Sequence, residues 1–220
     1  MVRYHVKIGL YILLCCVATS CQLSRSKVVS EEITLERAHA IHVVQQKMHP
    51  GDLLFRKGES VVSRLVDIGD THSVYSHVGI VFHDTCGWLI VHAVPGETDY
   101  PGEEERLKVE PVQDYLAPNR AVSFSLQRLA LTNLQIKTLK DKAIEYNIHP
   151  PLFDHDFDLD NDKLYCTEFI YKLYLAIGID LTAGHITHLK LPAFNGDYIL
   201  PSDLMRTHKL REIVHYNFKK

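Results

Sequence analysis

The spacing of apolar residues along the chain predicts several short strands and four helices. Apolar runs or alternating positions typical of strands occur in "HPGDLLF", "SHVGIVFHD", "GWLIVHAV", "LKVEPVQDYL" and "AVSFSLQRL". Helical spacing of three and four residues occurs in "ITLERAHAIHVVQQKM", "SVVSRLVDIG", "NLQIKTLKDKAIEYNI" and "CTEFIYKLYLAIG", the last stopping near Gly178. Because strands and helices come in blocks, the pattern predicts an α+β fold with an antiparallel sheet.

The first twenty residues have the pattern of an export signal. Arg3 and Lys7 precede the uncharged run "IGLYILLCCVATS", which is too short to span a membrane stably as a mature helix. The following "VATSC" resembles the lipobox of bacterial lipoproteins, with Ala18 in place of the more usual leucine. We therefore predict a lipoprotein signal peptide over residues 1–20 and lipidation of Cys21. An uncleaved anchor and a plain signal peptide cut nearby are the alternatives.

Length and charge set the remaining organisation. After Cys21 a polar tether is expected over residues 21–32, and one domain over residues 33–220. The formal charge of the 220-residue chain is -3, with no long basic run, so nucleic acid is not expected as a partner. The expected location is the cell envelope, with the domain facing the periplasm. Gln22 after the lipidation site favours the outer membrane.

Of the five cysteines, only Cys86 and Cys166 would remain in the exported domain without lipid. Cys166 begins a predicted helix, where unpaired amides and the helix dipole favour a thiolate. Such a thiolate with an imidazole nearby is the arrangement of a nucleophilic catalyst. A Cys86–Cys166 disulfide and a small core residue are the alternatives, since an oxidising compartment permits pairing.

His77 and His92 are the histidines most informative about such an imidazole. They lie on the two strands that flank "DTCG", and a loop of four or of two residues places both on one face of the hairpin. In the four-residue case His83 pairs with Trp88. The spacing therefore permits a His–His pair aimed at one place, and two ordinary strand histidines are the alternative.

Metal binding is not expected. "DHDFDLDNDK" has spaced acids, but Asn161 or Lys163 falls where a calcium loop of the EF-hand type needs glycine. The histidines of "HITH" have no matched carboxylate or cysteine at ligand spacing, so they are expected in a loop. No cofactor is expected.

Six short motifs occur in an order that resembles one family. They are "PGDLLF", "SHVGIVF", "IVHAVPG", "FDHDF", "LYCTEFIYK" and "LPSDL", which together span about Pro50 to Leu204. The chain resembles YiiX-like proteins, the circularly permuted branch of the NlpC-type, papain-like cysteine hydrolases. The resemblance implies a permuted papain-like fold in which the catalytic histidine precedes the cysteine.

The resemblance also implies roles for individual residues. Cys166 corresponds to the nucleophile and His77 to the general base, and the backbone N–H of Cys166 to one oxyanion donor. His92 falls where many relatives carry glutamate, and a neutral histidine orients a base without supplying negative charge. Tyr165 is expected to supply a hydroxyl or to shape the pocket. Asp154 is expected either to make structural hydrogen bonds or to form part of the pocket wall.

The expected function follows from these roles. We predict an exported, lipid-anchored cysteine hydrolase that cleaves an amide bond in a cell-wall peptide or a small acylated amine. A lipid thioesterase or acyltransferase on the same fold is the nearest alternative, and a non-catalytic envelope binding protein is the alternative of another class. The expected partners are the substrate and the membrane, through Cys21, and the oligomeric state is left open.

Overall fold

The structure is a computed structural model that describes residues 34–191 and 194–218. The predicted signal peptide, Cys21 and the tether therefore lie outside the described residues. The chain divides into two compact units, Met1–Ala40 with Phe218–Lys220, and Ile41–Asn217. In the first unit the Arg37 guanidinium lies 3.5 Å from the centre of the Phe218 ring. Among the described helices none combines the length and apolar character required to cross a membrane.

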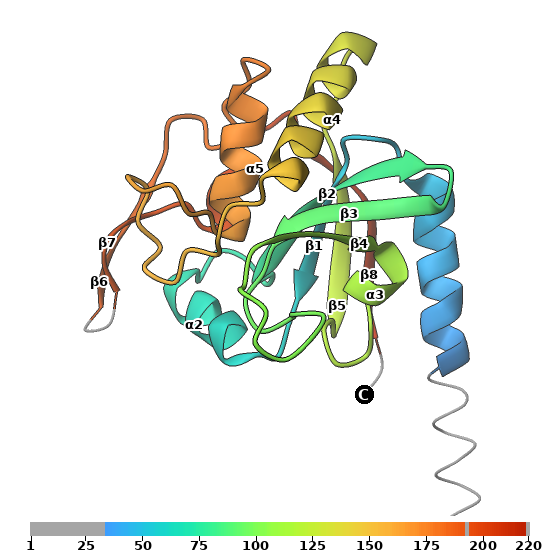
Figure 1. Cartoon of the computed structure of the whole chain (residues 1–220), viewed down its shortest axis with the longest axis horizontal. Helices are drawn as coiled ribbons and strands as arrows, with labels where there is room; N and C mark the ends of the chain where they lie inside the picture. Colours follow the sequence, from blue (N-terminus) through green and yellow to red (C-terminus); the bar gives the residue numbers. More distant parts are fainter. Residues whose placement is uncertain (1–33, 192–193, 219–220) are drawn as a thin grey trace, which may run out of the picture. The chain divides into compact units, whose positions relative to one another are not determined.

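The second unit contains the sheet and most of the helices (Figure 1). A helix over residues 34–47 precedes them. The elements that follow are β1 (Leu53–Lys57), α2 (Val61–Gly69), β2 (His77–Asp84), β3 (Gly87–Ala93), β4 (Leu107–Pro111), α3 (Val112–Tyr115), β5 (Ser123–Arg128), α4 (Asn133–Ile148), α5 (Cys166–Leu175), β6 (Thr187–Leu191), β7 (Phe194–Tyr198), α6 (Pro201–Leu204) and β8 (Arg211–Asn217).

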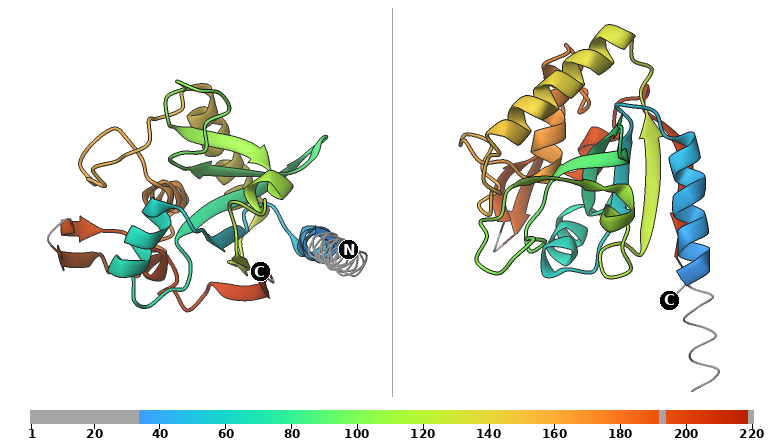
Figure 2. Two further views of the ribbon diagram at one scale, coloured as in Figure 1. Left: turned by 90° about the horizontal axis from the view of Figure 1, so that it is seen from below. Right: turned by 45° about the vertical axis from the view of Figure 1, so that its right-hand side comes forward.

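The main sheet has six strands in the order β4-β3-β2-β1-β5-β8, and every neighbouring pair is antiparallel. Strands β6 and β7 form a separate hairpin. Helices α4 and α5 contact each other and cover one face of the main sheet, as the views of Figures 1 and 2 agree. The predicted α+β class with an antiparallel sheet is confirmed.

The β2–β3 hairpin has the register on which the histidine spacing depends. His83 pairs with Trp88 and Asp84 with Gly87, which leaves a turn of two residues, Thr85 and Cys86. Gly79, on β2, lies against side chains of β3. A Cβ at this position would lie 2.6 Å from Cγ1 of Ile90 and 3.1 Å from Cβ of His92. Glycine therefore allows β3 to present Ile90 and His92 close against β2.

Helix α5 is fixed by apolar residues at helical spacing. Phe169, Ile170, Leu173 and Tyr174 are fully or almost fully buried in the core that the helix shares with β1 and β2. The helix ends at Leu175, and Gly178 follows with φ of +75°, a conformation that favours glycine after a helix. Burial of this one face holds the first residue of the helix, Cys166, in a fixed place beside β2.

Two elements differ from the predicted pattern. The strand expected over residues 107–116 ends at Pro111, and α3 follows because Val112 and Tyr115 bury their side chains at helical spacing. The second is β6. Of the two "HITH" histidines expected in a loop, His185 precedes this strand, whereas His188 lies in β6 and pairs with Asp197 on β7.

Candidate active site

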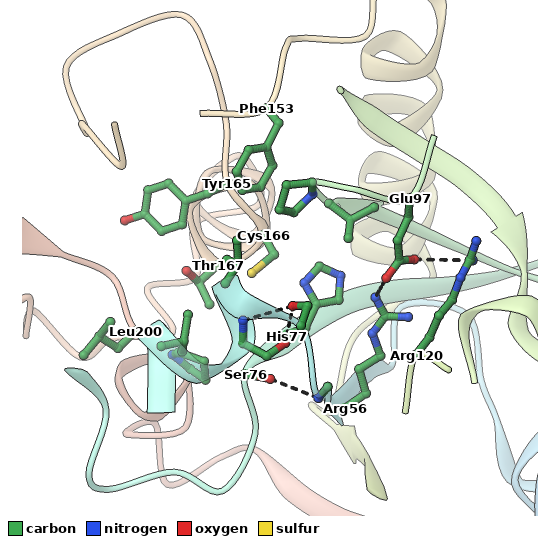
Figure 3. Close-up of a pocket in the computed structure, with 18 of the residues that line it drawn as sticks. Arg56, Ser76, His77, Glu97, Arg120, Phe153, Tyr165, Cys166, Thr167 and Leu200 are labelled. Carbon is green, nitrogen blue, oxygen red and sulfur yellow. Dashed lines mark hydrogen bonds and ion pairs between the residues drawn. The ribbon is translucent and has the colours of Figure 1, made fainter. Parts of the chain in front are cut away.

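Cys166 is the first residue of α5 and lies in a pocket together with His77, the first residue of β2. Figure 3 shows the sulfur of Cys166 directed toward the ring of His77. The N-cap residue, Tyr165, makes no side-chain hydrogen bond to the helix terminus, so its side chain does not cap the first amides of α5. The structure therefore brings together the predicted nucleophile and the predicted base.

The two histidines predicted to share a face are hydrogen-bonded to each other. Nε2 of His77 lies 2.8 Å from Nδ1 of His92, and both side chains are buried. Nε2 of His92 in turn lies 3.1 Å from Oε1 of Glu110 on β4. A line of three side chains, one from each of three neighbouring strands, thus leads from the catalytic pocket to a buried carboxylate.

Tyr115 and Arg56 pack behind the histidines. The Tyr115 ring lies edge-on to His92, with 5.0 Å between ring centres, and its hydroxyl donates to the Leu54 carbonyl at 2.9 Å. The guanidinium of Arg56 lies 4.2 Å from the centre of the Tyr115 ring and donates to the Tyr115 carbonyl at 2.7 Å. Arg56 also pairs across the strands with His77, which places a positive charge beside the predicted base.

Burial favours the uncharged forms of both Cys166 and His77. It raises the pKa of the Cys166 thiol to about 11, although hydrogen bonds from the backbone N–H groups of Val78 and Thr167 and the charge of Arg56 act in the opposite direction. Burial, then the charge of Arg56 and that of His92, lower the pKa of His77 well below its ordinary value. The helix terminus was expected to favour a thiolate, but burial outweighs it, so a thiol faces a neutral imidazole.

This pairing predicts an unusual alkylation profile. In the full-length chain, the rate at which iodoacetamide alkylates Cys166 should keep rising from pH 7 to beyond pH 9, because the thiolate fraction grows about tenfold per pH unit below the pKa. Peptide mass spectrometry would give the rate, and Cys86 in the same digest would correct for reagent loss. A plateau already reached by pH 7 would show a thiolate–imidazolium pair instead.

One wall of the pocket, residues 198–201, is attached to the nucleophile's own helix. The Ile199 N–H donates to the Tyr165 hydroxyl at 2.9 Å, and the Thr167 hydroxyl donates to the Ile199 carbonyl. Figure 3 shows the Tyr165 hydroxyl pointing away from Cys166. Of the two roles predicted for Tyr165, the structure places it in the second: its buried ring shapes the pocket, and its hydroxyl holds the wall.

Asp154 and Phe157 belong to the motif "FDHDF". Phe157 lines the pocket and has φ of +55°, a conformation that costs roughly 1–2 kcal/mol for a residue with a side chain. The buried carboxylate of Asp154 accepts hydrogen bonds from the N–H groups of the two residues that flank Phe157, Asp156 at 3.0 Å and Asp158 at 2.6 Å. Asp154 therefore makes structural hydrogen bonds that hold Phe157 in place, and it does not line the pocket itself.

The opposite end of the pocket is charged. Glu97 forms ion pairs with Arg56 and with Arg120, whose Nη1 lies 3.3 Å from Oε2 of Glu97 (Figure 3). Sequence reasoning missed these three residues and Glu110. Arg56 follows the motif "PGDLLF" directly, but its pairing with His77 is set by the sheet, so no local signal indicated it.

The other predicted features lie apart from this pocket. Cys86 is exposed in the hairpin turn, and both described cysteines are free, so Cys166 is not in the disulfide considered above. Asp52, the acidic residue of the motif "PGDLLF", is paired with Arg128 through two contacts of 2.7 Å. Within residues 34–191 and 194–218 no group of three or more histidine, cysteine, aspartate or glutamate side chains is placed to hold a metal ion.

Comparison with known proteins identifies the family. Residues 47–213 match the family model described as "Permuted papain-like amidase enzyme, YaeF/YiiX, C92 family". The chain belongs to this family. Membership in the YaeF/YiiX family makes it a cysteine amidase by class, with a permuted papain-like fold, as the motif order predicted. No curated protein sequence matches the chain.

A solved structure of similar fold is described as metalloprotein yiiX from Escherichia coli O157:H7. Its superposition has a TM-score of 0.62 at 20% sequence identity, and covers 76% of this chain and 97% of that one. At this identity the similarity concerns the fold of the YaeF/YiiX family.

Proposed function

We propose that the chain is an exported, lipid-anchored cysteine amidase that hydrolyses an amide bond in a cell-wall peptide or a small acylated amine. The observation that carries the proposal is the placement of Cys166, at the start of a buried helix, against His77 in one pocket. The family supplies the reaction class. Export and the lipid anchor rest on the pattern of residues 1–21.

The proposed mechanism is acyl transfer through the thiol. His77 takes the proton of Cys166 as the sulfur attacks the substrate carbonyl, which avoids a free thiolate that burial disfavours. The N–H of Cys166, at the start of α5, is the proposed donor to the oxyanion. His77 then protonates the leaving amine, and water enters to release the acyl group from the sulfur.

The pocket lining favours an apolar acyl group next to the scissile bond. Phe153 and Leu200 lie away from the charged end (Figure 3), and Val62, Val66 and Phe157 also line the pocket. This lining also supports the second candidate function, a thioesterase or acyltransferase acting on lipid acyl groups. The charged end formed by Arg56, Glu97 and Arg120 lies where a polar leaving group or the rest of a peptide would extend.

One assay separates the candidates. The full-length chain would be incubated with an amide, an ester and a thioester that carry the same acyl group, and with cell-wall peptide fragments, and released amine, alcohol and thiol would be measured. We expect Cys166-dependent release of amine. Cleavage of the ester and thioester alone would overturn the amidase in favour of the lipid enzyme. Binding without any cleavage would support the binding protein.

The lipid anchor predicts a change on replacing Cys21. In a bacterial host that processes lipoproteins, the wild-type chain should enter the detergent phase with the mass of a diacylglyceryl group, because two acyl chains anchor a protein stably. Cys21→Ala should lack that mass, and Cys86→Ala should retain it. A wild-type chain without the mass of a diacylglyceryl group would exclude lipidation at this position.

A further inference from the structure

The residue that contacts the base His77 is a histidine, His92, and a neutral imidazole brings no negative charge to the base it orients. A carboxylate nevertheless lies next along the same line, since Oε1 of Glu110 contacts His92. We propose that Glu110 is a positioning residue that fixes the tautomer of both histidines and supplies, through His92, the charge that stabilises protonated His77. The inference rests on the proposed Cys166–His77 mechanism.

Glu110 is a carboxylate at any pH at which the enzyme would work. Burial raises its pKa, but the interaction with His92 and the hydrogen bond and charge of Arg120 outweigh burial and bring the pKa to about 2. Nη1 of Arg120 lies 2.7 Å from Oε2, and Nζ of Lys108 lies 3.5 Å from the same oxygen. Oε2 of Glu110 therefore contacts the two cations, and Oε1 contacts the imidazole of His92.

Because Glu110 can only accept hydrogen bonds, it determines which ring nitrogens of His92 and His77 carry a hydrogen. A carboxylate only accepts, so Nε2 of His92 carries a hydrogen. Burial, first of all, lowers the pKa of His92, so its ring is neutral and its Nδ1 holds a lone pair. That lone pair accepts from Nε2–H of His77 at 2.8 Å. The remaining nitrogen of His77, Nδ1, is then the lone pair that accepts the Cys166 proton.

The same arrangement acts when that proton is transferred. His77 becomes an imidazolium in a buried site beside Arg56, whose positive charge disfavours it. Glu110 opposes this effect by holding the intervening His92 as an acceptor. The carboxylate has its own cations in Arg120 and Lys108, so it is stable in the resting enzyme as well.

A purely structural role for Glu110 gives a different expectation. In that case the residue would serve only as the partner of Arg120, which also contacts Glu97 and the Asp114 carbonyl. Its replacement would then lower stability and leave the histidine protons where they are. The tautomers of His77 and His92 therefore distinguish the two roles without any substrate.

The test is a long-range ¹H–¹⁵N spectrum of the full-length chain labelled with ¹⁵N-histidine, with His92→Gln for assignment. In the wild type both His77 and His92 should carry the hydrogen on Nε2. In Glu110→Gln the amide both donates and accepts, so His92 should populate the other tautomer and His77 should follow. A wild-type His77 that carries its hydrogen on Nδ1 would overturn the proposal, as would unchanged tautomers in Glu110→Gln.

Kinetics give the second readout. With the amide substrate, Glu110→Gln should lower kcat by about 10- to 100-fold with KM nearly unchanged. Glu110→Asp keeps the charge and should recover part of the loss. Lys108→Met is the matched control, since it removes a cation from Oε2 and leaves Oε1 in place. If no substrate is cleaved by the wild type, the proposed function fails, whereas the tautomer result still decides the role of Glu110 as a positioning residue.

Discussion

Replacing Cys166 by alanine should reduce amide hydrolysis by on the order of 10⁴-fold or more, because no acyl-enzyme can form without the sulfur. The substitution removes one sulfur atom at the start of α5, where the helix is held by the buried residues Phe169, Ile170 and Leu173. We therefore expect the thermal unfolding midpoint to change little. The measurement is kcat with the amide substrate, together with a thermal unfolding curve.

The matched control for that variant is Cys86→Ala. Cys86 is the other described cysteine and is exposed in the turn between β2 and β3. It should retain wild-type hydrolysis. Equal activity in Cys166→Ala and Cys86→Ala would exclude Cys166 as the nucleophile, whatever the fold.

His77→Ala should reduce hydrolysis by about 10²- to 10⁴-fold, the usual contribution of a general base. The expected size depends on the resting thiol: since burial raises the pKa of Cys166 to about 11, few molecules hold a thiolate near neutral pH without the imidazole's help. His83→Ala is the control, because His83 lies on the same strand with an exposed side chain.

The pH dependence gives His77 a further signature. His77 acts as a base only when neutral, and its pKa is lowered well below 6.5. Activity should therefore persist as the pH falls through 6.5 and decline only at lower pH. A decline centred at or above pH 6.5 would contradict a buried neutral base. An unchanged rate in His77→Ala would exclude the residue from the mechanism.

Much of the site could be predicted because its signals are local. Cys166 begins an apolar helical run, and the turn after Asp84 is short enough to set the relative faces of His77 and His92. Both signals depend on residues less than about twenty positions apart. The order of the six motifs added the fold, which the family match confirms.

The parts that could not be predicted depend on which strands become neighbours. Glu110 reaches His92 because β4 pairs with β3, where Lys108 lies opposite His92. Arg56 reaches His77 because β1 pairs with β2. Neither pairing follows from the local pattern, since the loop between β3 and β4 shows no turn of fixed length. Glu110 thus looked like one more polar residue on a strand.

The attachment of residues 198–201 to α5 uses main-chain atoms of Ile199, its N–H and its carbonyl. Any residue other than proline offers these two groups, so the attachment places few demands on the side chains around it. Leu200, which faces the pocket from this segment, is therefore open to replacement without loss of the attachment. Within such a wall, substrate preference can diverge among related enzymes while the nucleophile's position is inherited unchanged.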